Sequence, residues 1–175
     1  MKKRMPLVLF LSALVLACAG SEDFDVFPGH QPVIHASYAP SVIRPGAAWR
    51  VYLHAEDYDG DMKEIVILVT QTGTPPFPTS FVKLKDQDTT EVAGYLWLAT
   101  TNDVSMLGDR LEATIVVRDR RDNTSEPLKF SLRFAYQAPQ EIPEQWKGPA
   151  DRELGVLSSD IAAPSQGRPT RGEGL

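Results

Sequence analysis

Residues 128–134 read LKFSLRF, in which Leu128, Phe130, Leu132 and Phe134 alternate with polar residues. Successive side chains of a β-strand point to opposite faces of a sheet, so this order puts an apolar row on one face and a polar row on the other. The stretch therefore predicts a strand of a sheet that has one face in a core and the other in solvent.

The same period of two recurs on the N-terminal side of this stretch. Residues 49–56 and 111–118 alternate in the same way, whereas 65–69 and 92–99 are apolar on both faces. Turn-forming pairs such as Pro45-Gly46 and Asp122-Asn123 separate these segments. The predicted strands cover residues 33–38, 49–56, 65–69, 81–84, 92–99, 111–118 and 128–134. About seven short strands at this spacing predict an all-β fold, a single two-sheet antiparallel sandwich over residues 32–136.

Part of this region resembles bacterial Ig-like, PKD-like and cadherin-like modules. Their second strand commonly runs into an acidic turn and then a third strand, as residues 49–55, 57–61 and 65–67 do here, and residues 116–125 look like their last hairpin. The resemblance implies an Ig-like sandwich. The chain departs from antibody-type domains because it has no cysteine pair, no tryptophan in the third strand and no tyrosine corner. A fold of this class does not by itself fix a function.

The N-terminus is typical of a secretory signal. Basic residues at 2–4 precede 13 almost entirely apolar residues at 5–17, which are too few to span a bilayer as a helix. Residues 15–18, Val-Leu-Ala-Cys, resemble the bacterial lipobox. This resemblance implies that residues 1–17 are a signal peptide, that Cys18 carries a covalent lipid, and that Ala19 after it directs the protein to the outer membrane, facing the periplasm.

The remaining chain divides by composition. Residues 18–31 are expected to form a lipidated N-terminus and tether, and 137–175 a Pro/Gly-rich, largely irregular tail with a short helix near 150–157. Without the three basic residues of the signal, 15 basic residues remain against 23 acidic ones, a formal charge of about −8. Such a balance argues against nucleic acid as a partner.

Cys18 is the only cysteine, so disulfides and cysteine-rich metal sites are excluded from the domain. The sequence carries no hydrolase elbow, phosphate loop or nucleophile–base spacing, and we expect the protein not to be an enzyme. His35 and His54 come together if the first two strands pair, but two imidazoles alone make a poor zinc site.

The sharpest candidate for a site is the acidic turn. Glu56, Asp57, Asp59 and Asp61 lie within six residues, and Ig-type strand order brings Asp119 toward them. Carboxylates are the ligands that calcium prefers, so a calcium site is one interpretation. The alternative is a solvated polar turn in which arginines at 118, 120 or 121 balance the aspartates.

A second candidate is an apolar patch. If the alternate residues of 65–69 face the core, Val66 and Leu68 face outward, with Val116 on the same outer face. An outward apolar patch is unusual unless something covers it, and the cover is either a partner or the apolar residues of the chain's own tail, which we favour. The functions that remain are an envelope module that binds another protein, an accessory subunit of an envelope or secretion assembly, and a small-ligand carrier or enzyme.

Overall fold

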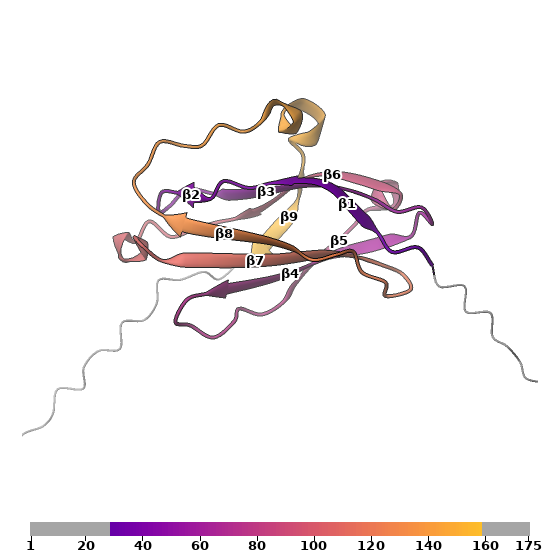
Figure 1. Cartoon of the computed structure of the whole chain (residues 1–175), viewed down its shortest axis with the longest axis horizontal. Coiled ribbons are helices and arrows are strands. Elements are labelled where there is room, and N and C mark those ends of the chain that lie inside the picture. Colours follow the sequence, from indigo (N-terminus) through magenta and orange to yellow (C-terminus); the bar gives the residue numbers. More distant parts are fainter. Residues whose placement is uncertain (1–28, 159–175) are drawn as a thin grey trace, which may run out of the picture.

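The computed structural model describes residues 29–158, so the predicted signal peptide and Cys18 lie outside the described residues. Two β-sheets face each other in a sandwich (Figure 1). The first sheet has the order β1-β3-β6-β9 and the second β2-β8-β7-β4-β5. The strands are β1 (Val33–Tyr38), β2 (Val42–Ile43), β3 (Trp49–Glu56), β4 (Met62–Gln71), β5 (Ser80–Lys83), β6 (Glu91–Leu98), β7 (Arg110–Asp119), β8 (Leu128–Phe134) and β9 (Glu153–Ser158).

All seven predicted strands are confirmed, and the all-β sandwich with them. The burial of the strands follows the period of two in the sequence, because the inward residues of β3, β4 and β7 are buried completely or nearly so. The core between the sheets includes Trp49, Ile67, Leu96 and Ile115, none of which is accessible to solvent. Burial of this apolar surface supplies the main driving force for folding.

Two strands were not predicted. β2 pairs in parallel with β8, and β9 pairs in parallel with β6, so the sandwich is not purely antiparallel. The prediction of a short helix near 150–157 is wrong, because a 3-10 turn at Gly148–Ala150 is followed by β9. The sandwich therefore extends from residue 33 to residue 158, and residues 153–158 of the predicted tail are part of its fold.

β9 replaces the predicted helix for a packing reason. As a strand at the edge of the first sheet, β9 places the side chain of Leu157 in the common core, where it is fully buried. Gly94 of β6 makes room for the approach, since a Cβ atom there would lie 2.4 Å from the carbonyl oxygen of Arg152. The Tyr95 amide then donates to that same oxygen at 2.8 Å.

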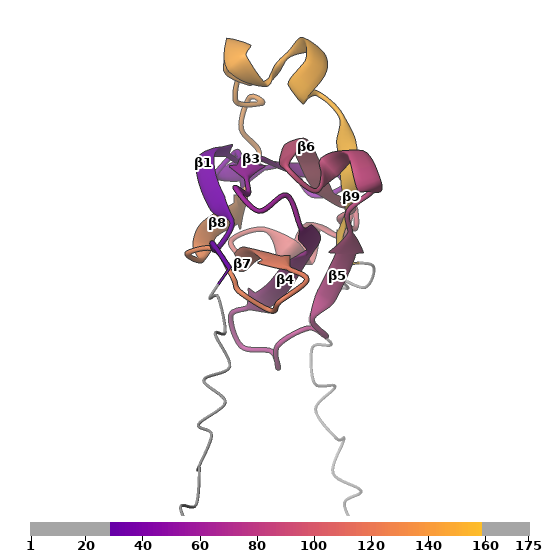
Figure 2. The same ribbon diagram turned by 90° about the vertical axis from the view of Figure 1, so that its right-hand side faces the viewer.

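Residues 137–152 form a segment, the strap, that leads from β8 to β9. In Figures 1 and 2 it arches over the outer face of the first sheet, on the side away from β4 and β7. Trp146 of the strap is 3% exposed and packs on Tyr52 of β3, with 5.5 Å between ring centroids. Asp151 accepts hydrogen bonds from Arg50 at 3.0 Å and from the Tyr52 hydroxyl at 3.2 Å. The strap thus contacts the outer face of the first sheet around Arg50 and Tyr52.

Within residues 29–158, no helix has the length and apolar character needed to cross a membrane.

Candidate functional site

The acidic turn lies between β3 and β4, and the structure brings the end of β7 beside it. The Asp57 carboxylate accepts hydrogen bonds from the amides of Asp59 at 3.3 Å and Asp61 at 3.0 Å. The Asp119 carboxylate is fully buried and accepts from the amide of Arg121 at 2.8 Å. Both groups therefore brace their own turns.

The other two aspartates contact cationic or polar side chains. The Asp59 carboxylate accepts from the His30 amide at 2.8 Å and lies 3.2 Å from Arg121 Nη1. The same guanidinium lies 3.6 Å from Asp61. The arginine that balances the aspartates in the polar-turn interpretation is thus Arg121, while calcium binding by Asp57, Asp59, Asp61 and Asp119 stays a prediction.

The surroundings of Asp61 disfavour its charged form, although Arg121 lies beside it. Burial, followed by the neighbouring Asp57 and Asp119, raises the pKa of the Asp61 carboxyl. Its buried Oδ1 atom has no hydrogen-bond partner among the described residues. The folded protein then holds this proton more tightly than the unfolded chain does, so ionised Asp61 opposes folding above its folded-state pKa, and this penalty fades as the pH falls. A bound cation would relieve the same penalty.

Calcium at millimolar concentration is expected to raise the melting temperature of the protein, and Asp59→Asn to abolish that rise. Differential scanning calorimetry with calcium, and again with a chelator, measures both effects. Magnesium at equal concentration controls for ionic strength. It has the same charge as calcium but requires shorter ligand distances and a stricter octahedral geometry. If calcium does not change the melting temperature of the wild-type protein, only the polar-turn interpretation remains.

The predicted apolar patch lies on the outer face of the second sheet. Val66 pairs directly with Val116 of β7 and, on its other side, with Phe81 of β5. Leu68 is 38% exposed and Phe81 53% exposed. The Arg118 guanidinium lies 5.6 Å from the centre of the Phe81 ring. Phe81 thus joins the predicted residues, although the sequence of 80–83, Ser-Phe-Val-Lys, does not alternate and carries no signal for its outward side chain.

The tail does not cover this patch within the described residues. Trp146 packs against the first sheet and Leu157 enters the core, so the two largest apolar residues of the tail face elsewhere. We refer to Val66, Leu68, Phe81 and Val116 as the β4–β5–β7 patch.

A group of side chains that the sequence did not connect lies on the outer face of the first sheet. Glu56 Oε2 lies 3.2 Å from His35 Nε2, and Glu56 Oε1 lies 3.7 Å from His54 Nε2. The latter nitrogen is also 2.9 Å from Glu91 Oε1. His54, Glu56 and Glu91 form a group whose ligand atoms all lie within 4.8 Å of one another, which is compact enough to hold a metal ion.

The backbone explains how these residues meet. β3 is flanked by β1 and β6, and Glu56 pairs directly with Glu91 across the β3–β6 ladder. On the β1 side the register shifts between Ile34 and Ala36, so that the extra residue there is His35. A bulge of this kind re-aims side chains and here turns His35 toward the outer face that carries His54. The two imidazole rings lie 5.9 Å apart.

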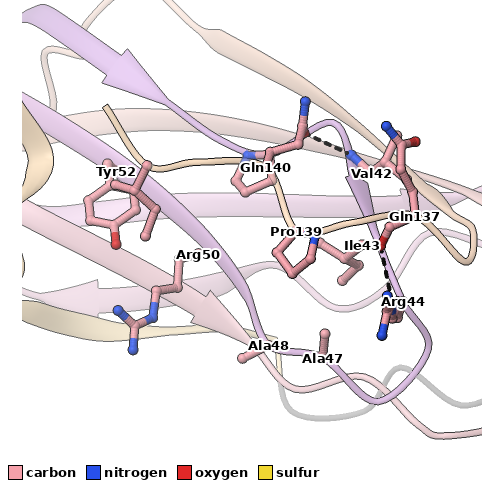
Figure 3. Close-up of a pocket in the computed structure, with 12 residues that line it drawn as sticks. Val42, Ile43, Arg44, Ala47, Ala48, Arg50, Tyr52, Gln137, Pro139 and Gln140 are labelled. Atoms are coloured by element: carbon pink, nitrogen blue, oxygen red, sulfur yellow. Dashed lines mark hydrogen bonds between the residues drawn. The ribbon is translucent and has the colours of Figure 1, made fainter. Parts of the chain in front are cut away.

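A cavity of about 240 Å³ lies between β2, β3 and the strap (Figure 3). Its walls are mainly apolar and include Val42, Ile43 and Pro139. Its two arginines engage partners within the chain, since Arg44 donates to the Gln137 carbonyl at 3.1 Å and Arg50 to Asp151. A small-ligand site would have polar groups that converge on the cavity. The two arginines instead bind partners within the chain.

No protein-family model matches the chain, and no curated protein matches it. Two solved structures are similar in part. The CARDB domain of a Pyrococcus furiosus protein, solved in complex with di-metal ions, is 16% identical over 60% of this chain and 86% of its own, with a TM-score of 0.32. A chain from the complex of zinc 2-glycoprotein and prolactin inducible protein of human seminal plasma is 12% identical over 63% of this chain and 99% of its own, with a TM-score of 0.35.

Proposed function

We propose that the protein is a lipid-anchored, non-catalytic module of the bacterial cell envelope that binds another envelope protein through the β4–β5–β7 patch. The observation that carries this proposal is the row of apolar side chains across three adjacent strands, from Val116 through Val66 to Phe81. Contiguous exposed apolar surface of this kind marks sites of protein contact.

The composition of the patch supports a protein as its partner. Phe81 offers a large ring at the edge of the sheet, and the Arg118 guanidinium, which Glu64 holds by hydrogen bonds, lies beside that ring. Aromatic residues and arginine are enriched in the energetically dominant parts of protein interfaces. Because β5 is the edge strand of its sheet among the described residues, a partner that contacts Phe81 approaches the patch from the side of the sheet.

A photo-crosslinking residue at position 81 of the membrane-bound protein is expected to form one discrete adduct with an envelope protein. Leu68→Lys should abolish the adduct, because it places a charge in the apolar contact. Ser131→Lys is the matched control, since Ser131 is exposed on β8 of the same sheet but outside the patch. An adduct that survives Leu68→Lys, or that Ser131→Lys also removes, would refute this surface as the interface.

The anchor is proposed from the sequence alone, with an outer-membrane location facing the periplasm. The protein is expected to partition into the detergent phase on Triton X-114 separation, because an acyl-modified Cys18 carries a large apolar group. Cys18→Ser should move it to the aqueous phase. A wild-type chain already found in the aqueous phase would contradict the lipoprotein assignment without touching the fold.

A further inference from the structure

We propose that the outer face of the first sheet binds one divalent transition-metal ion, with zinc as the fitting ion, through His35, His54, Glu56 and Glu91. This site is separate from the β4–β5–β7 patch and adjoins the acidic turn, because Glu56 directly precedes Asp57. It does not depend on the proposed protein partner.

The donor set suits zinc. Imidazole nitrogen and carboxylate oxygen are its ordinary ligands in proteins that lack cysteine, and four protein ligands complete a tetrahedral site. Calcium and magnesium instead prefer shells made only of oxygen, so two imidazoles select against both.

The distances fit one small ion. Zinc binds nitrogen and oxygen at about 2.0–2.2 Å, so its tetrahedral ligand atoms lie roughly 3.3–3.5 Å from one another. Within the compact group the pairs are 2.9 Å for His54–Glu91 and 3.7 Å for His54–Glu56 Oε1, and His35 lies 3.2 Å from the other carboxylate oxygen of Glu56, Oε2. These values lie on both sides of the required spacing, and side-chain rotations alone would bring an ion into contact with His54, Glu56 and Glu91.

The scaffold holds the group in place. The ligands come from three neighbouring strands of one sheet, and Glu56 and His54 both lie on its central strand β3. Ligands on strands are positioned more precisely than ligands on loops. The bulge in β1 supplies the fourth donor, His35, while Ile34 and Ala36 on either side remain paired with β3.

The charge of the group is uncompensated. Among the described residues, Glu56 and Glu91 form salt-bridge contacts only with histidines, and no lysine or arginine is paired with them. In the acidic turn, by contrast, Arg121 lies beside both Asp59 and Asp61. With neutral imidazoles, the two carboxylates leave a local charge that a divalent cation would neutralise.

The site is open to solvent on one side. A cavity of about 300 Å³ borders it, lined by His54, Glu91 and Trp146. The indole nitrogen of Trp146 is buried without a hydrogen-bond partner in the described part of the chain. The side chains of His54 and Glu91 are 30% and 63% exposed, so the ion would enter and leave without opening the sandwich.

Zinc titrated into the full chain in detergent, followed by isothermal titration calorimetry, tests the proposal. We expect one ion per chain, and at least tenfold weaker binding in His54→Gln and in Glu56→Gln. His30→Gln is the matched control, because His30 also contacts a carboxylate, Asp59, but lies outside the group. Its affinity should stay within twofold of wild type.

Two further measurements separate ligand loss from misfolding and from binding at the acidic turn. In the presence of a chelator, the melting temperatures of His54→Gln and of the wild type should agree, since the side chain at position 54 is partly exposed. A large excess of calcium should leave zinc binding unchanged. Zinc affinity that both substitutions leave within twofold, or that calcium abolishes, would overturn the proposal.

Discussion

Leu157→Ala is expected to lower the free energy of unfolding by about 2–5 kcal/mol, the usual range for a fully buried leucine. The side chain of Leu157 has no solvent exposure and belongs to the same cluster as residues of β3 and β4. Its loss leaves a cavity where the edge of the first sheet meets the core. Chemical denaturation followed by tryptophan fluorescence measures the change.

Val156→Ala is the matched control, because Val156 is the adjacent residue of β9 and is 38% exposed. It should cost well under half as much, since its side chain leaves less apolar surface in contact with the protein. Equal, small effects at both positions would show that β9 does not contribute to the core. Such a result would support the sequence-based prediction that this segment is irregular.

The parts of the fold that the sequence predicted are those with a local signature. Strands such as β3 and β8 carry their alternation within themselves, and burial follows from it directly. β9 has no such signature, because ELGVLS is short and contains a glycine, and its position depends on a parallel partner, β6, far away in the sequence. β2 consists of two residues, too few to form any pattern.

The same distinction applies to the candidate sites. The approach of Asp119 to the acidic turn follows from Ig-like strand order and was predictable. The meeting of His35, Glu56 and Glu91 depends on the register of two ladders and on a bulge. Neither the register nor the bulge is encoded in a periodicity of the chain, so the sequence indicated the two histidines and, in the acidic turn, Glu56, but not that they meet each other and Glu91.

Trp146→Ala is expected to release the strap while the sandwich stays folded. Trp146 is 3% exposed and stacks on Tyr52, and truncating a buried tryptophan costs about 3–5 kcal/mol. Because the strap lies outside the two sheets, most of this loss should appear as local opening. A loss of about 3 kcal/mol corresponds to roughly a hundredfold faster exchange of the strap amides.

Hydrogen exchange read by mass spectrometry distinguishes the two kinds of loss. Amides of the strap, such as those of Lys147 and Asp151, should lose protection, whereas those in the β4–β7 ladder should change little. Gln145→Ala, at an exposed neighbouring position, should leave both unchanged. If both regions lose protection equally in Trp146→Ala, the strap and the sandwich unfold as one unit. Selective loss would instead show that the strap opens separately from the sandwich, beside the cavity that Trp146 lines with His54 and Glu91.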